Sequence, residues 1–240
     1  TDIMLAIDVS TSMLAEDLKP NRLEAAKDVA AEFINGRPND NIGITLFAGE
    51  TFTQCPLTVD HAVLLDMIHN IKCGLIEDGT AVGMGVANAV TRLKDSKAKS
   101  KVVILLTDGT NNKGDISPLT AAEIAKSFGI RVYTIGVGTN GMAPYPYPVG
   151  NTVQYINMPV EIDEKTLTQI AGTTDGNYFR ATSNSKLKEV YEEIDKLEKT
   201  KLNVKEYSKR EEDYRWFALA AFLCVLLEVL LRNSILKKIP

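Results

Sequence analysis

Two apolar runs in this 240-residue chain end abruptly in polar residues that include an aspartate. The first, residues 3–7, is followed at once by Asp8, and the second, residues 102–106, is followed by Thr107 and Asp108. A continuous apolar run of this length is typical of a strand buried on both faces. Such strands occur in parallel sheets covered by helices on both sides, so the two runs favour an α/β fold.

Strand-like and helix-like segments alternate as far as residue 199. The helical spacing of apolar residues predicts helices at residues 20–36, 60–71, 81–93, 117–128, 164–171 and 184–199, and apolar runs predict further strands at residues 42–48, 51–54, 131–136 and 177–180. Only Gly49 and Glu50 separate two of these strands, which favours a hairpin. We therefore predict a doubly wound, Rossmann-like α/β domain over residues 1–200, with a mostly parallel sheet and one antiparallel edge strand.

The residues that follow the first strand offer oxygen atoms at alternate positions. Asp8, Ser10 and Ser12 supply one carboxylate and two hydroxyls. These hard donors suit Mg²⁺, Mn²⁺ or Ca²⁺ and not zinc or copper. In open α/β sheets, ligands bind at the carboxyl ends of the strands, which is where this run lies. The alternative is that the serines are only helix N-caps or turn formers.

Together with Thr80 and Asp108, this run resembles the metal-ion-dependent adhesion site of von Willebrand factor A (VWA) domains. That site uses Asp-x-Ser-x-Ser, a distant Thr and a distant Asp, and the matching residues here are Asp8, Ser10, Ser12, Thr80 and Asp108. The resemblance implies that hydroxyls and water hold the metal, that Asp108 often acts through water, and that a partner's Asp or Glu completes the shell. Taken singly, Thr80 is equally an N-cap of the next helix, and Asp108-Gly109 a plain turn.

A metal-dependent hydrolase or phosphotransfer enzyme is the alternative function, because a hard metal on such a sheet also serves that chemistry. However, Ser10 stands where a phosphotransfer site would usually carry a second acid, and the chain contains no Gly-x-x-x-x-Gly-Lys loop. Residues 136–141 match Gly-x-Gly-x-x-Gly, but prolines and no helix follow them. We therefore predict a binding module that is not an enzyme. A purely structural domain with an empty site is a third interpretation.

Residues 138–159 do not fit the alternating pattern. They contain Ala143-Pro-Tyr-Pro-Tyr-Pro148, followed by Val153-Gln-Tyr-Ile156. Because this stretch follows a strand, we expect a turn or β-hairpin that projects at the metal end of the sheet. Its aromatic residues serve either as a partner contact or as packing against the domain edge, and the sequence leaves both open.

The C-terminal part differs in kind. Residues 216–231 carry a single charge, Glu228, and span ~24 Å as a helix, against ~30 Å for a hydrocarbon core. We predict a stalk at residues 201–215, a transmembrane helix at 216–236 and a basic cytoplasmic tail at 237–240, because positive charges stay on the cytoplasmic side. The VWA domain would then lie in the periplasm. The alternative is a buried or amphipathic C-terminal helix.

A VWA domain followed directly by one such helix resembles the Bat (Bacteroides aerotolerance) membrane proteins, and BatA more closely than BatB. The residues that carry the resemblance are 77–81, the Pro/Tyr-rich loop and residues 226–231. It implies a scaffold in the bacterial inner membrane that affects stress or oxygen tolerance, with other Bat proteins and a MoxR-type AAA+ ATPase as partners. The chain begins at Thr1, without a Met, and is already inside a strand by Ile3, so we expect further segments upstream.

The charge balance argues against nucleic acid as a partner. Residues 1–215 carry 24 basic and 30 acidic side chains, and they form no basic stripe. Cys55 and Cys73 are either two separate thiols or a pair, and spacing alone does not decide between these. The chain has no Cys-x-x-Cys motif or Cys/His cluster, which excludes the usual structural zinc sites.

Overall fold

The computed structural model describes residues 1–150 and 152–207 and positions 221, 225, 228 and 229, with side chains described as far as residue 199 within the long C-terminal helix. Residues 208–215 of the predicted stalk, most of the predicted transmembrane segment 216–236 and the tail 237–240 lie outside the described residues. Within the described part of the chain, no helix combines the length and the apolar character needed to span a bilayer.

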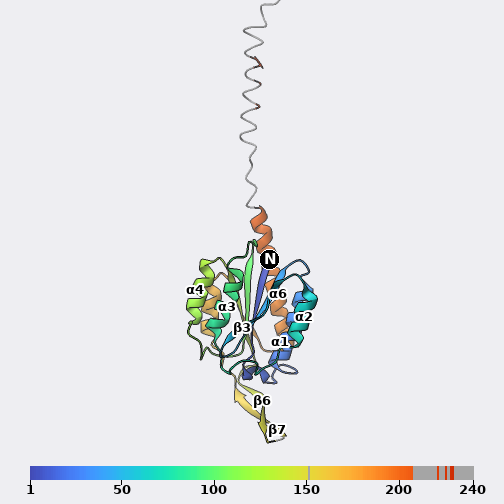
Figure 1. The fold of residues 1–240 in the computed structure, drawn as a ribbon, viewed down its shortest axis with the longest axis vertical. Helices are drawn as coiled ribbons and strands as arrows, with labels where there is room; N and C mark the ends of the chain where they lie inside the picture. The colour runs from blue at the N-terminus through green and yellow to red at the C-terminus, as the bar shows by residue number, and fades with distance from the viewer. Residues whose placement is uncertain (151, 208–220, 222–224, 226–227, 230–240) are drawn as a thin grey trace, which may run out of the picture. The chain divides into compact units, whose positions relative to one another are not determined.

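A six-stranded sheet forms the centre of the first unit, residues 1–198. Its strands lie in the order β3-β2-β1-β4-β5-β8. Their bounds are β1 Asp2–Asp8, β2 Asn41–Phe47, β3 Thr51–Thr58, β4 Lys101–Thr107, β5 Arg131–Val137 and β8 Tyr178–Ala181. Only the pairing of β2 with β3 is antiparallel, and β3 lies at the edge (Figure 1). The predicted Rossmann-like α/β class with its antiparallel strand pair is therefore confirmed.

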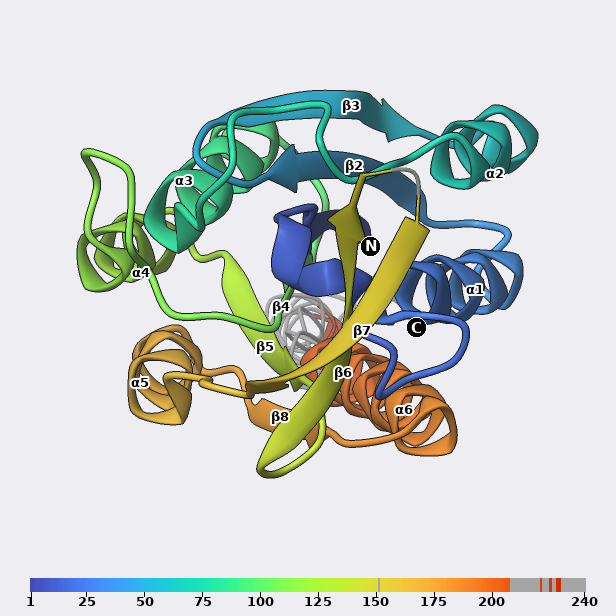
Figure 2. The ribbon, with the colours of Figure 1, turned by 90° about the horizontal axis from the view of Figure 1, so that it is seen from below.

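Helices cover both faces of this sheet. Their bounds are α1 Arg22–Asn35, α2 His61–His69, α3 Val82–Leu93, α4 Pro118–Ser127, α5 Glu164–Thr173 and α6 Asn184–Tyr207. Side chains alternate along a strand, so Ile3, Leu5 and Ile7 pack with α1, α2 and α6, whereas Met4 and Ala6 pack with α3, α4 and α5. Figure 2 shows the two groups of helices on opposite sides of the sheet. Because both faces of the sheet are buried, the central strands appear in the sequence as continuous apolar runs.

Several boundaries differ from the predictions for local reasons. The first long helix begins at Arg22 and not at residue 20, because the Asn21 side chain caps it by accepting a hydrogen bond from the Glu24 amide at 2.8 Å. Strand β3 continues to Thr58, beyond the predicted end at residue 54. The short 3₁₀ helix η1, Thr11–Leu14, was not predicted, since a single turn leaves no periodic pattern.

The Pro/Tyr-rich stretch forms a separate two-stranded antiparallel sheet that projects from the domain (Figure 1). Its strands are β6 Met142–Val149 and β7 Thr152–Pro159. The Pro144 carbonyl points outward from the pair, where it accepts a hydrogen bond from the Glu16 amide at 2.8 Å. By alternation, Pro146 and Pro148 also face outward, so none of these prolines interrupts the ladder with β7. The prediction of a β-hairpin at this place is thus confirmed.

Candidate metal centre

The two predicted aspartates lie at the ends of neighbouring strands. Strands β1 and β4 are parallel, with Ile7 opposite Leu106, so Asp8 and Asp108 come to the same edge of the sheet. Both are almost completely buried, with exposures of 0% and 3%. Two carboxylates removed from water at one place need positive charge, hydrogen-bond donors or protons to offset the cost of burial.

Hydrogen bonds hold Asp8 in a single orientation. Its Oδ1 accepts from the Ser10 amide at 2.9 Å, and its Oδ2 accepts from the Thr107 hydroxyl at 2.6 Å. Burial and the nearby charge of Asp108 outweigh these bonds and raise the pKa of Asp8 to about 7. A carboxylate that is costly to keep charged gains when a cation binds beside it.

Ser10, Ser12 and Asp108 form a continuous chain of oxygen atoms. The two serine Oγ atoms are 3.0 Å apart, and the Ser12 hydroxyl donates to Asp108 Oδ1 at 2.7 Å. Ser10 occupies the N-cap position of η1, but its side chain makes no capping hydrogen bond. Ser10 therefore has the backbone position of an N-cap, but its hydroxyl lies against the Ser12 hydroxyl and does not cap the helix.

Thr80 reaches the same place from the loop before α3. Its backbone is held by Asn112, whose side-chain oxygen accepts from the Thr80 amide at 2.9 Å and whose amide donates to the Thr80 carbonyl at 3.0 Å. A Cβ atom added at Gly109 would lie 3.4 Å from the Thr80 hydroxyl, so this hydroxyl lies beside the Asp108-Gly109 turn. The N-cap of α3 is Ala81, without a side-chain cap, so Thr80 does not serve as the cap.

Arg22 is the main residue of this cluster that sequence patterns did not reveal. Its guanidinium donates to Asp108 Oδ2 at 2.8 Å and, through Nε and Nη2, to both oxygens of Asp17 at 2.8 Å, and Arg22 is only 4% exposed. Burial raises the pKa of Asp108, although Arg22 and the Ser12 hydroxyl partly offset this. Burial acts in the same direction on Asp17, but hydrogen bonds from Arg22 and the Thr139 amide prevail and lower its pKa.

The loop that carries Thr80 is fastened to the Ser-rich turn. The Asp78 carboxylate accepts from the Thr11 amide at 3.0 Å and from the Thr11 hydroxyl at 2.7 Å. Glu77, one residue earlier, forms an ion pair with Lys113. Asp78 and Thr11 thus hold the loop against the Ser-rich turn, and no periodic pattern in the sequence predicts this contact.

The donor set fits a hard divalent cation. Asp8, Asp108, Ser10, Ser12 and Thr80 contribute only oxygen atoms, and the described residues contain no group of three or more His, Cys, Asp and Glu side chains placed to hold a metal. Oxygen donors with few charges suit Mg²⁺, Mn²⁺ or Ca²⁺. Assigning these five residues as ligands is a prediction, which the hydrogen-bond geometry supports.

Cys55 and Cys73 are both free thiols. Of the two alternatives, separate thiols are therefore confirmed and a disulfide between them is wrong. Cys73 lies next to the cluster, with Sγ donating to the Ser10 carbonyl at 3.4 Å. Burial, followed by the charges of Asp8 and Asp108, raises the pKa of Cys73 to about 12. Cys73 is therefore a neutral thiol at physiological pH and a poor metal ligand or nucleophile.

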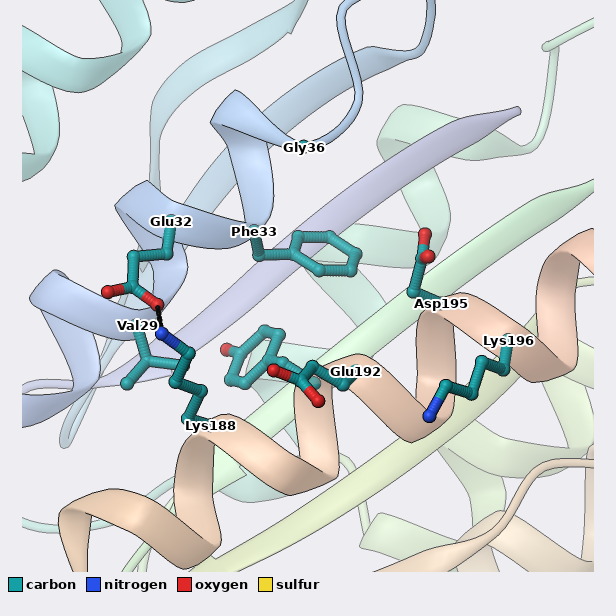
Figure 3. A pocket seen from close by; sticks show the side chains of 9 residues that line it. Val29, Glu32, Phe33, Gly36, Lys188, Glu192, Asp195 and Lys196 are labelled. Atoms are coloured by element: carbon teal, nitrogen blue, oxygen red, sulfur yellow. Dashed lines mark ion pairs between the residues drawn. The ribbon is translucent and has the colours of Figure 1, made fainter.

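A pocket of about 290 Å³ lies between α1 and α6, on a helical face of the domain (Figure 3). The Phe33 and Tyr191 rings pack 5.1 Å apart in it, and Lys188 pairs with Glu32 at 2.8 Å across its mouth. Acidic and basic side chains alternate around it, without the convergence on one point that a binding site requires. The cluster at the strand ends is the stronger candidate.

Comparisons with known proteins point to the same family of domains. The family described as von Willebrand factor type A domain matches residues 2–193. An aerotolerance-related membrane protein from Bacteroides fragilis is 33% identical, with a TM-score of 0.70 over 82% of this chain and 99% of that one. BatB from Bacteroides thetaiotaomicron is also 33% identical, with a TM-score of 0.72 over 83% and 99%.

Two more distant comparisons bear on the metal and on the length. Proximal thread matrix protein 1 from the mussel byssus, solved with zinc in its MIDAS motif, is 26% identical, with a TM-score of 0.63 over 82% of this chain and 45% of that one. A UPF0353 protein from Mycolicibacterium paratuberculosis is 30% identical over 79% of this chain. The chain spans only 58% of the length of that mycobacterial relative.

Proposed function

Because the chain belongs to the von Willebrand factor type A family, and within it to the aerotolerance-related Bat proteins, we propose that it is a metal-dependent protein-binding module and not an enzyme. The observation that carries the proposal is the chain of oxygen atoms from Ser10 through Ser12 to Asp108, with Asp8 held against the Ser10 amide and Thr80 beside the Asp108-Gly109 turn. A divalent cation bound there would supply an electrophilic position for an Asp or Glu carboxylate of the partner.

The residues of the cluster have distinct tasks in this proposal. Asp8 supplies the main negative charge, and the hydroxyls of Ser10, Ser12 and Thr80 supply neutral oxygens. Arg22 offsets much of the charge of Asp108 through their 2.8 Å ion pair. With little negative charge facing the cation, the site would retain a strong attraction for an incoming carboxylate. The metal that we propose is Mg²⁺, with Mn²⁺ or Ca²⁺ as substitutes.

The partners and the membrane setting are proposals that depend on the family. We propose that the protein scaffolds a complex of Bat membrane proteins, together with a MoxR-type AAA+ ATPase, that affects stress or oxygen tolerance. The solved relative from Bacteroides fragilis is an aerotolerance-related membrane protein, which supports the membrane setting. A BatA-like identity, with BatB-like second, is likewise a proposal.

Exchange of Asp8 tests the function directly. The full-length protein, with any upstream part, would be purified from its host membranes in Mg²⁺ or in EDTA, and the co-purifying proteins would be identified. We expect a partner that is lost in EDTA and lost with Asp8→Ala, because both changes remove the cation. Asp66→Ala, an exposed aspartate on α2, is the matched control and should retain the partner. Partners that survive both EDTA and Asp8→Ala would contradict a metal-dependent module.

The proposed topology has its own test. If residues 216–236 cross the inner membrane and residues 237–240 lie in the cytoplasm, Ile239→Cys places a cysteine in the tail without removing a charge, and it should react with a membrane-impermeant maleimide only after the cells are opened. Cys55, Cys73 and Cys224 would be replaced by alanine in the same protein. Labelling of this cysteine from outside intact spheroplasts would contradict the proposed orientation of the helix.

A further inference from the structure

The β6–β7 hairpin exposes an unusual amount of apolar surface. Residues 138–160 contain no charged side chain. Among the described residues of the hairpin, Met142, Tyr147, Val153 and Tyr155 are all more than half exposed, at 55%, 52%, 58% and 60%. Exposed apolar side chains concentrated on one uncharged hairpin commonly mark a contact with another molecule.

The pairing register divides the hairpin into two faces. Ala143 pairs with Met158, and Tyr145 pairs with Ile156, so these side chains share one face with Tyr147. The five line a pocket of about 290 Å³. Val153 pairs with Pro148 and lies on the other face. The hairpin therefore has a pocket face and an outer face.

The opposite wall of this pocket belongs to the candidate metal centre. It consists of Thr11, Ser12, Ala15 and Arg22. Ser12 is one of the proposed ligands, and Arg22 holds Asp108. The pocket and the metal centre thus share side chains and form one continuous surface.

Hydrogen bonds fasten the base of the hairpin to the metal centre. The Asp17 carboxylate accepts from the Thr139 amide at 2.7 Å while it also pairs with Arg22. The Glu16 amide donates to the Pro144 carbonyl at 2.8 Å. At Gly138, with φ of +143°, a Cβ atom would lie 2.9 Å from Arg22 Nη2, so the chain passes directly over the guanidinium. The pocket is therefore held in place beside the cluster.

We propose that the pocket receives an apolar side chain of the same partner segment whose carboxylate binds at the metal centre, an inference that rests on the proposed function. The charges complement such a segment: a cation site at one end attracts the carboxylate, and an uncharged hairpin at the other favours a neighbouring Leu, Met or Phe. A charged residue in that position would be desolvated against Tyr145 and Ile156 without an ion-pair partner on the hairpin. The recognised sequence is thus an acidic residue with an apolar residue close to it.

Synthetic peptides test this specificity. The base peptide carries one Asp in the middle of a Gly/Ser chain, and a series places one Leu at each of three positions on either side of the Asp. Binding to the full chain would be measured by NMR titration in Mg²⁺ and in EDTA. At one or two neighbouring positions we expect Leu to tighten binding about tenfold or more, because burying a Leu side chain contributes on that scale. The gain should require Mg²⁺ and the Asp.

Substitutions on the two faces of the hairpin show where the Leu side chain of the peptide binds. Ile156→Ser and Met158→Ser should remove the Leu advantage and leave the binding of the base peptide unchanged, which also shows that the metal centre is intact. Val153→Ser, at an apolar residue on the outer face that is more exposed than Ile156 or Met158, is the control and should retain the full advantage.

The remaining outcomes distinguish a failure of the pocket proposal from a failure of the proposed metal-dependent function. Mg²⁺-dependent binding of the base peptide without any gain from Leu would overturn the pocket proposal and leave the metal-dependent module in place. Equal binding of the Leu peptides in Mg²⁺ and EDTA would overturn the link between pocket and metal centre. If no peptide binds, the inference fails, and the Asp8→Ala purification still decides the function independently.

Discussion

Arg22 shows how one residue can adjust the charge of a whole site. Its guanidinium lies between Asp17 and Asp108 and is buried with both of them. A buried carboxylate without a partner is costly, so the arginine favours the charged form of Asp108, partly offsetting its burial, and reduces the negative field that a bound cation would meet. The residue sits at the first position of α1, where Asn21 caps the helix and fixes the direction in which the side chain leaves.

We expect Arg22→Met to lower the free energy of unfolding by about 3–5 kcal/mol in EDTA, because two buried carboxylates lose their counter-charge. Saturating Mg²⁺ should restore part of this loss, since the cation replaces the missing charge at Asp108. Urea denaturation with and without Mg²⁺ measures both values. Arg92→Met, which removes an exposed arginine from α3, is the control and should cost less than about 0.5 kcal/mol. An equal loss with and without Mg²⁺ would show that Asp108 does not face the metal.

Glycines set how closely the elements around the site approach one another. In α3, a Cβ atom at Gly83 would lie 2.0 Å from the Ile116 carbonyl oxygen, and one at Gly85 would lie 2.7 Å from the Phe47 ring. Helix α3 therefore packs against the segment before α4 and against β2 only because these positions lack side chains. This close packing positions the Thr80 loop, which leads directly into α3.

Two helical glycines make a matched pair of substitutions. Gly83→Ala should destabilise the protein by about 1–3 kcal/mol or more, because the new methyl group meets backbone atoms that cannot rotate away. Gly172→Ala in α5, where nothing lies within 4 Å of the added atom, should stabilise it by roughly 0.5 kcal/mol through the higher helix propensity of alanine. Thermal unfolding of both variants gives the comparison. A neutral Gly83→Ala would mean that α3 and the segment before α4 can move apart.

At the scale of the whole domain, one polar cluster lies at the carboxyl ends of the strands and another at their amino ends. The metal centre lies at the carboxyl ends of β1 and β4. At the amino ends, the buried Glu198 of α6 accepts hydrogen bonds from Ser100 and Tyr133 at 2.8 and 2.6 Å and pairs with Arg131. Seven-residue strands separate the two clusters by roughly 20 Å.

We expect Glu198→Gln to cost about 1–3 kcal/mol of stability, since it weakens a buried charged hydrogen-bond network, and to leave the Mg²⁺ affinity unchanged. Combined with Asp8→Ala, its effect on the free energy of unfolding should add within about 0.5 kcal/mol, because the sites share no partners. A double-mutant cycle by urea denaturation, with Mg²⁺ titrations of each variant, measures both quantities. A coupling well above 1 kcal/mol would reveal communication between the metal centre and α6.

The order of elements, the class of the sheet and the oxygen donors at the strand ends all followed from the amino-acid sequence. These are local properties: apolar periodicity reports burial one segment at a time, and Asp8, Ser10 and Ser12 are neighbours in the chain. The transmembrane helix and the partners are also sequence-based predictions, and they remain so. Arg22 beside Asp108, the position of the Thr80 hydroxyl and the pocket shared by the hairpin and the metal centre were decided only by the tertiary structure. Each of these features joins residues that lie far apart in the chain: Thr80 and Gly109 are 29 positions apart, and Ser12 and Met158 are 146 apart. No local pattern encodes a contact between side chains that only folding brings together.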